Sequence, residues 1–398
     1  MEKKDKNLNV PNLRFPEFSG EWELVRLGDV CKFFSGGTPS STNKDFYGGD
    51  IPFIRSGEIH CSSTELYISE AGLNSSSAKI IEQGDLLLAL YGATSGDIAI
   101  SKIKGAINQA ILCIRTNHDN FFLKSCWEKH CRKLLQTYLQ GGQGNLSADI
   151  VKSIKMSFPS CLEQKKISGF LALIEERITT QKKIIEDLKK LKDAINNSLH
   201  NNINEFQLFS FNELGNDYSG LTGKSSDDFG SGLPYISYLN VFRNDIVTDG
   251  PFDYVKVAKS EKQNIVSYGD LLFTLSSETP NEVGIGAIYL GKTNPLYLNS
   301  FCFGVHLSNQ ENILGPYLAY FVTSQYFRKT ILPFAQGSTR YNLMKSDFMK
   351  HKFRFPNMAT QKAIYNALHT LSEKIQNEEV CLNKYTEQKQ YLLTRLFI

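Results

Sequence analysis

The sequence lacks the features of a membrane, secreted or disulfide-bonded protein. No apolar run in its 398 residues approaches the length that spans a bilayer, and the N-terminus "MEKKDKNLNVPNLRFPEF" has no apolar signal core. Its eight cysteines are scattered and form no CxxC pair, so we expect reduced thiols in the cytoplasm. Cys126, His130 and Cys131 lie close together, but no second ligand pair stands at a matching spacing, and we predict no metal site.

Recognisable catalytic motifs are also missing. "TGKSS" (222–226) has the end of a phosphate-binding loop, but Tyr218 stands where the first glycine is required. "GIGAIYLG" (284–291) has its third glycine too late for a dinucleotide-binding turn. The sequence contains no HExxH or GxSxG motif, and no Asp/Asn-Pro-Pro-aromatic tetrapeptide of amino-methyltransferases. We therefore predict a binding protein without catalytic residues or a cofactor of its own.

Charge is distributed in the same way in both halves of the chain. The net charge is only +3. Residues 41–85 and 225–282 are acidic, whereas residues 124–155 and 324–354 are basic, with six basic residues against two acidic and seven against one. A single basic stretch is usually a solvated face, but two at corresponding places indicate a shared electrostatic role.

An internal duplication organises the chain. The segment "FPSCLEQKKISGFLALIEERI" at Phe158 returns at Phe355 as "FPNMATQKAIYNALHTLSEKI". Four upstream segments recur in the same order, at offsets that drift as loop insertions would produce. They are "IPFIRSGEI" (51–59) and "LPYISYLNV" (233–241), "IIEQGDLLLALYG" (80–92) and "NIVSYGDLLFTLS" (264–276), "AINQAILCIR" (106–115) and "YLNSFCFGVHL" (297–307), and "QGGQGNLSADIVKSIKMSFP" (140–159) and "QGSTRYNLMKSDFMKHKFRFP" (336–356).

The pattern predicts an α+β fold with two tandem β-rich domains, separated by two long helices that form an antiparallel coiled coil. In each repeat, short apolar runs between Gly, Ser, Asn and Thr clusters predict strands, and a helix follows near 121–139 and 315–331. The predicted parts are an N-terminal tail (1–20), a first domain (21–159), a first long helix (160–203), a second domain (204–356) and a second long helix (357–398).

The two long helices carry matching heptad seams. From Ile167, ten positions at alternating steps of four and three recur 197 residues later, and eight of the ten are apolar in both copies. Each run is about 50 Å long at 1.5 Å per residue, longer than a helix that covers only its own domain needs to be. The predicted seam is Ile167, Leu171, Ile174, Ile178, Ile185, Leu188, Ile195 and Leu199, with Ile364, Leu368, Leu371, Ile375, Leu382, Tyr385, Leu392 and Leu396.

The chain resembles the specificity subunit of type I restriction–modification systems. The resemblance extends from Leu13 to Ile398 and rests on "LRFPEFSGEWELVRLGDV", "SGGTPS" (35–40), "GDLLLALYGATSGDIAI", "NQAI" (108–111) and "QGGQGNLSADIVKSIKMSFPSCLEQKKI". The ordered set is specific because it occurs twice, each time before a long helix. The second repeat departs from it where Ser276, Ser277 and Glu278 replace Tyr91, Gly92 and Ala93, and where Thr360 replaces Glu163.

This resemblance implies two target recognition domains, each of which reads one half of a split sequence in double-stranded DNA. It also implies two modification (methyltransferase) subunits that dock on the helices, bind S-adenosylmethionine and methylate adenine. Restriction subunits, where a system has them, translocate and cleave DNA. We therefore expect S-adenosylmethionine, ATP and magnesium on partner subunits and none on this chain.

Polar loop residues near the basic segments are the candidates for DNA contacts, because donors and acceptors read base edges while Lys and Arg hold phosphates. The base-reading candidates are Ser35, Gly36, Gly37, Thr38, Arg55, Ser56, Gln143 and Asn145, and Thr222, Gly223, Lys224, Ser237, Tyr238, Ser338, Thr339, Arg340 and Asn342. The phosphate candidates are Lys124, Lys129, Arg132, Lys133, Arg328, Lys329, Lys350 and Lys352.

Two other functions compete with this one. A fused methylation or restriction enzyme is disfavoured by the missing motifs. A structural repeat protein that pairs through its helices without touching DNA is disfavoured by the duplicated basic segments. The loops of the two domains differ, with "SGGTPSST" (35–42) against "SGLTGKSS" (219–226). The sequence therefore predicts two different half-sites, which form an asymmetric, bipartite target with a spacer of fixed length.

Overall fold

The structure is a computed structural model that describes residues 9–138, 146–203, 205–308 and 311–398. The chain divides into two compact units. The first unit contains Met1–Lys182 and Val380–Ile398, and the second contains Lys183–Glu379. Each unit therefore combines one β-rich domain with portions of both long helices.

The β-rich domain of the first unit consists of two four-stranded sheets and a two-stranded ladder. Its strands are β1 (Glu23–Arg26), β2 (Cys31–Ser35), β3 (Tyr47–Ile54), β4 (Tyr67–Ile68), β5 (Lys79–Ile81), β6 (Leu86–Ala89), β7 (Ile98–Ile100), β8 (Gly105–Ile107), β9 (Ile111–Thr116) and β10 (Lys155–Phe158). The sheet orders are β2-β9-β6-β7 and β4-β3-β8-β5, and β1 pairs with β10. The helices are α1 (Leu27–Val30), α2 (Glu70–Asn74), α3 (Asn120–Tyr138) and α4 (Ala148–Ser153), with 3-10 turns η1 (Lys44–Phe46), η2 (Ser56–Glu58) and η3 (Gly92–Thr94).

The second unit repeats this plan with one further sheet. Its strands are β11 (Gln207–Ser210), β12 (Gly215–Ser219), β13 (Phe229–Ile236), β14 (Ile246–Val247), β15 (Asp253–Val255), β16 (Leu271–Thr274), β17 (Ser276–Ser277), β18 (Gly286–Tyr289), β19 (Tyr297–Leu298), β20 (Cys302–Leu307), β21 (Ala335–Gln336), β22 (Tyr341–Leu343) and β23 (Lys352–Phe355). The sheet orders are β12-β20-β16-β18-β14, β15-β13-β19, β17-β22-β21 and β11-β23. Because β12-β20-β16-β18 corresponds strand for strand to β2-β9-β6-β7, the predicted duplication is confirmed.

The helices of the second domain differ from the prediction in one respect. They are α6 (Phe211–Leu214), α7 (Tyr238–Arg243), α8 (Gly315–Phe321), α9 (Gln325–Ile331) and α10 (Lys345–Lys350), with 3-10 turns η4 (Ser226–Asp228), η5 (Pro280–Glu282) and η6 (Leu332–Phe334). The single helix predicted for 315–331 is thus two helices. The side chain of Ser324 accepts a hydrogen bond from the backbone N–H of Phe327 at 3.2 Å, and this cap begins a new helix.

The repeated Gly-Asp-Leu-Leu sequence builds the same turn and strand in both domains. Gly84 and Gly269 have φ angles of +94° and +88°, a left-handed conformation that favours glycine. Asp85 and Asp270 each accept a hydrogen bond at 2.8 Å from the backbone N–H three residues earlier. The leucines that follow begin β6 and β16, whose residues are all buried. The motif therefore positions an inner strand of each sheet.

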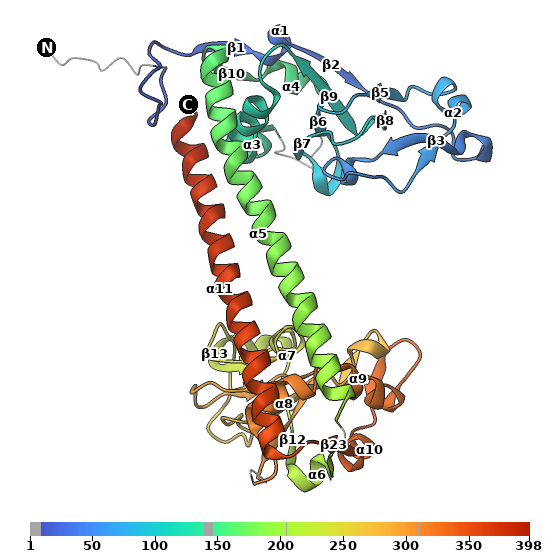
Figure 1. The fold of residues 1–398 in the computed structure, drawn as a ribbon, viewed down its shortest axis with the longest axis vertical. Helices are drawn as coiled ribbons and strands as arrows, with labels where there is room; N and C mark the ends of the chain where they lie inside the picture. The colour runs from blue at the N-terminus through green and yellow to red at the C-terminus, as the bar shows by residue number, and fades with distance from the viewer. Residues whose placement is uncertain (1–8, 139–145, 204, 309–310) are drawn as a thin grey trace, which may run out of the picture. The chain divides into compact units, whose positions relative to one another are not determined.

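The two long helices, α5 (Cys161–Asn201) and α11 (Met358–Leu396), are uninterrupted (Figure 1). The repeated glutamines Gln164 and Gln361 fasten their first turns. The Gln164 side chain donates to the carbonyl of Pro159 at 2.9 Å and accepts from the backbone N–H of Asp119 at 3.1 Å. The Gln361 side chain donates to the carbonyl of Pro356 and accepts from the backbone N–H of Leu314, both at 2.8 Å. Both side chains are completely buried. None of the described helices is long and apolar enough to cross a membrane.

None of the sixteen apolar residues of the predicted seam is exposed. In the first unit, Leu171 of α5 shares a hydrophobic core with Leu396 of α11. In the second unit, Leu368 of α11 shares a core with Leu199 of α5. The N-terminal part of each helix therefore packs with the C-terminal part of the other, which is antiparallel pairing.

The lysines that interrupt the seam meet carboxylates. Lys389 Nζ lies 2.8 Å from Glu128 and 2.7 Å from Glu175, and Lys192 Nζ lies 2.5 Å from Asp245. Burial opposes ionisation of Glu175 and Lys389, but the ion pairs outweigh it, so the pKa of Glu175 is lowered and that of Lys389 is raised. Because Glu128 and Asp245 belong to the β-rich domains, these ion pairs join each domain to the helix beside it.

Candidate nucleic-acid interface

Three loops of the second domain that carry base-reading candidates come together around Phe301. This residue lines a cavity of about 320 Å³ together with Tyr238 and Arg340. It also lines a second cavity, of about 430 Å³, together with Gly223 and Lys224. The ring is 47% exposed, although most phenylalanines of this unit are buried in its core. The candidates from separate parts of the sequence therefore surround one exposed aromatic side chain.

Phe301 is absent from the residues predicted from the sequence, although a signal for it exists. In the first repeat, Asn108 Oδ1 accepts a hydrogen bond from the N–H of Ala110 at 3.2 Å. In the second repeat, Asn299 Oδ1 accepts one from the N–H of Phe301 at 2.9 Å. The two turns match, so a phenyl ring stands where the first domain has only a methyl group. Aromatic residues are enriched at binding surfaces, which marks this position as a candidate.

Arg340 is held beside Phe301, and among the described residues only its Nε has a hydrogen-bond partner. Its Nε donates to Ser276 Oγ at 2.9 Å, and its guanidinium lies 4.8 Å from the centre of the Phe301 ring. Asn342 pairs with Ser276 across β22 and β17 and is exposed. Ser338 and Thr339 precede it as exposed residues of the same loop. These four candidates remain available for contacts with DNA.

Arg55 and Ser237 occupy the same place in the two repeats and serve as helix caps, while their contact with bases stays a prediction. The backbone N–H of Arg55 donates to Glu58 at 3.1 Å, and that of Ser237 donates to Asn240 at 2.9 Å. The Arg55 guanidinium also pairs with Glu58 and, at 2.6 Å, with Glu65. Burial raises the pKa of Glu58, but hydrogen bonds from Arg55 and backbone N–H groups outweigh it and lower that pKa to about 2.

Gly36, Gly37 and Lys224 also have structural roles, and their contact with DNA stays a prediction. A Cβ on Gly36 would lie 1.7 Å from the carbonyl oxygen of Ile107, and one on Gly37 would lie 2.7 Å from Ser77, so backbone packing requires both glycines. The Lys224 side chain is only 5% exposed, donates to the carbonyl of Lys256 at 2.6 Å and forms an ion pair with Glu261.

The other base-reading candidates are spread between surface and interior. Thr38 is exposed, and its Oγ1 lies 2.5 Å from Gln109 Oε1 in the turn that corresponds to that of Phe301. Thr222 and Gly223 are exposed, whereas Ser35, Ser56 and Tyr238 are half-buried. Gln143 and Asn145 lie outside the described residues. The contact of any of these residues with DNA stays a prediction.

Three phosphate candidates are turned toward the protein, and this corrects their assignment. Lys124 is 8% exposed and pairs with Glu128 and Glu175, both at 2.7 Å. Lys129 Nζ donates to the carbonyl of Phe397 at 2.6 Å. Arg328 donates to two backbone carbonyls at 2.7 and 2.9 Å. Burial lowers the pKa of Lys129 and of Arg328, as expected for cations removed from water.

The remaining phosphate candidates lie at the surface. Lys133 of α3 is exposed in the first unit. Lys329, Lys350 and Lys352 are exposed in the second unit, and Lys352 lies 3.3 Å from Glu213, a surface pair that contributes little to stability. The side chain of Arg132 falls outside the described part of the chain. The exposed lysines of the second unit therefore form the best-defined candidate set for phosphate contacts.

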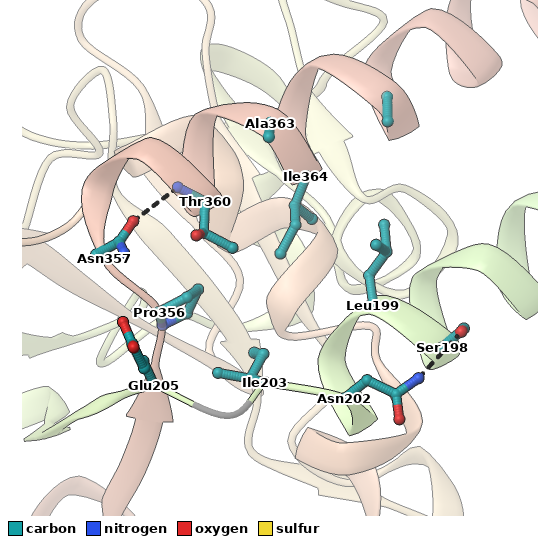
Figure 2. A pocket seen from close by; sticks show the side chains of 11 residues that line it. Ser198, Leu199, Asn202, Ile203, Glu205, Pro356, Asn357, Thr360, Ala363 and Ile364 are labelled. Carbon is teal, nitrogen blue, oxygen red and sulfur yellow. Dashed lines mark hydrogen bonds between the residues drawn. The ribbon is translucent and has the colours of Figure 1, made fainter.

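A further difference between the repeats is a groove in the second unit, between the end of α5 and the start of α11. Figure 2 shows that Leu199 of α5 and Ile364 of α11 line it, with Thr360 at one side. Its volume is about 430 Å³. Its lining is largely aliphatic and contains a single carboxylate, that of Glu205, so it does not resemble a site for phosphate or base edges.

The corresponding place in the first unit is filled by the N-terminal segment. Arg14 forms a bidentate ion pair with Glu163 at 2.8 and 2.7 Å, and Phe15 packs edge-on against Phe170 with ring centres 6.0 Å apart. The side chain of Glu163 is buried. In the second repeat, Thr360 and Ala367 stand at the positions of Glu163 and Phe170. The departure at Thr360 is thus explained, because no arginine needs a partner there.

Comparison with known proteins identifies the family. The family model described as the type I restriction modification DNA specificity domain matches residues 19–190 and again residues 204–384. These two matches cover most of the chain. The chain belongs to the family of type I restriction–modification specificity subunits. Its two β-rich domains are target recognition domains in tandem, as the sequence predicted.

Similar proteins agree with this assignment. The type I restriction enzyme MjaVIII specificity subunit of Methanocaldococcus jannaschii is 24% identical, over 94% of this chain and 91% of its own length. The EcoR124I/EcoR124II specificity subunit of Escherichia coli is 27% identical over 47% of this chain and 44% of its own. The crystal structure of the type I S subunit from M. genitalium has a TM-score of 0.57 at 14% identity, covering 98% of this chain and 99% of that one, which supports the same fold.

Proposed function

We propose that this specificity subunit directs a cytoplasmic type I restriction–modification complex to an asymmetric, bipartite DNA target. Each target recognition domain reads one half-site in the major groove. Methylation of adenine, DNA translocation and cleavage belong to partner subunits, together with S-adenosylmethionine, ATP and magnesium. The chain itself carries out none of these reactions.

The observation that carries this proposal is one shared frame with two different surfaces. The asparagine-capped turn, the Gly-Asp turn and the inner strand recur in both domains. On this frame, the first domain presents Ala110 and Gln109 where the second presents Phe301 and Ser300. Base edges are distinguished by the side chains that face them, so two different surfaces on one frame fit two different half-sites.

The long helices support the docking of two methyltransferase subunits. In the first unit, Leu162 and Leu173 of α5 are exposed and lie three helical turns apart on one face. In the second unit, Ile184 and Leu191 of α5 are exposed and lie two turns apart on one face. Exposed apolar side chains on a helix face are candidate contacts for partner subunits, and each unit offers such a pair.

Copurification and methylome sequencing test this function together. When the chain is coexpressed with its methyltransferase partner, we expect a complex that methylates a split, non-palindromic sequence. The purified chain without the partner should transfer no methyl group, which serves as the control. A contiguous or palindromic methylated motif, or a chain that neither binds the methyltransferase nor confers any sequence preference, would overturn the proposal.

A further inference from the structure

The Phe301 cavity of the second domain combines chemical groups that the first domain does not place there. It is lined by one arginine, Arg340, and two carboxylates, Glu278 and Glu282, beside aromatic side chains. At the position of Glu278 the first repeat has Ala93. At about 320 Å³ the cavity lies at the lower end of the range of ligand sites. A group that the other domain lacks is not required by the shared frame, which makes it a candidate for recognition by this domain.

Arg340 presents a bidentate donor edge at this cavity. Its Nε is engaged with Ser276 at 2.9 Å, which leaves the Nη1 and Nη2 edge for a ligand. Its position is restrained on two sides, because the Phe301 ring lies under the guanidinium and Tyr341, the next residue, pairs with Ser277 across β22 and β17. A restrained guanidinium edge matches the O6 and N7 acceptors of guanine, the commonest specific contact to DNA.

Glu278 supplies an acceptor at the same cavity. Glu282 accepts a hydrogen bond from Ser277 Oγ at 2.6 Å and so contributes to the local fold. Glu278 is exposed at the cavity. A carboxylate near DNA is repelled by phosphates, so its favourable role there is to accept a hydrogen bond from a base. In the major groove, the cytosine N4 amino group is the donor that a carboxylate accepts.

We propose that Arg340 and Glu278 read the two bases of one G·C pair in the half-site of the second domain, with Arg340 on guanine and Glu278 on cytosine. This inference rests on the proposed function, since it names a base pair within the target. Phe301 supports the guanidinium in the orientation that the guanine contact needs. The first domain has Ala93 in place of Glu278 and Ala110 in place of Phe301, so it reads its half-site by other residues.

The test uses the full chain in complex with its methyltransferase partner, with the methylome as the readout. Arg340→Ala removes the bidentate donor edge, so discrimination for G·C at one position should fall by about 5- to 150-fold. Glu278→Gln should admit A·T at that same position, because a carboxamide pairs with adenine. Glu311→Gln removes an exposed carboxylate of the same unit that does not line the cavity, and it should change neither half-site.

The two half-sites separate the possible results. Changes at one position of one half-site, with the other half-site intact, would support the inference and show that the variants fold. A wild-type half-site of the second domain without a G·C pair would overturn it. Variants that keep full discrimination at every position would overturn it too, while the proposed function would still stand. If the wild-type complex shows no sequence preference, the proposed function itself fails.

Discussion

Mild acid should destabilise the second unit through His200. This side chain is 4% exposed near the end of α5. Its Nδ1 lies 2.9 Å from the carbonyl oxygen of Asn196, and its Nε2 lies 3.1 Å from the hydroxyl of Tyr317. A carbonyl only accepts, so Nδ1 carries the proton and Nε2 accepts from the tyrosine. Protonation of Nε2 would reverse that hydrogen bond, because the Tyr317 hydroxyl would have to accept it, and would bury a charge.

The size of the effect follows from the pKa shift. Burial lowers the pKa of His200 from 6.5 to about 4. Because the folded pKa is the lower one, the unfolded chain binds the proton first as the pH falls. The stability that this group contributes is therefore complete above about pH 6.5 and is lost progressively between pH 6.5 and 4. Proton linkage predicts a loss of about 2 kcal/mol between pH 7.5 and 5.

Urea denaturation of the full chain at pH 7.5 and 5 measures this loss. His200→Phe introduces the residue that the second repeat has at this position, Phe397, and should reduce the pH dependence of the second unit's unfolding free energy by about 2 kcal/mol. If His200→Phe retains the full pH dependence of the wild type, the assignment of a neutral, buried His200 is refuted.

Three further predictions concern the helices and the DNA surface. Glu175→Gln should destabilise the first unit by roughly 1–3 kcal/mol in urea denaturation, because Lys124 and Lys389 lose a shared partner, whereas Glu176→Gln at the exposed neighbour should be neutral. Ala367→Phe places the aromatic residue of the first repeat in the open groove and should raise the second unit's free energy of unfolding by up to about 1 kcal/mol. A decrease of more than about 1 kcal/mol would show that the groove has no room for the ring. Replacing Lys329, Lys350 and Lys352 together by Gln should weaken binding to every DNA sequence alike and reduce the salt dependence of binding, as measured by fluorescence anisotropy. A changed sequence preference would show that these lysines do not contact phosphates.

The sequence by itself determined the duplication, the two long helices and their seam. These features are periodic or repeated, so each can be recognised without knowing what lies nearby in space. The heptad spacing identified sixteen apolar positions, and the structure exposes none of them. The glutamines Gln164 and Gln361 were visible as a repeat, but their role in fastening each helix to its domain was not.

Only the tertiary structure decided which polar residues face outward. Lys124, Lys129 and Arg328 lie in the basic segments of the sequence, yet each is bound to a carboxylate or a carbonyl from a distant part of the chain. The sequence does not show which group pairs with a charged residue, because folding brings the two together from distant parts of the chain. The cluster around Phe301 is decided in the same way. Its residues come from four separate segments of the second domain, and only the packing of the sheets brings them to one surface.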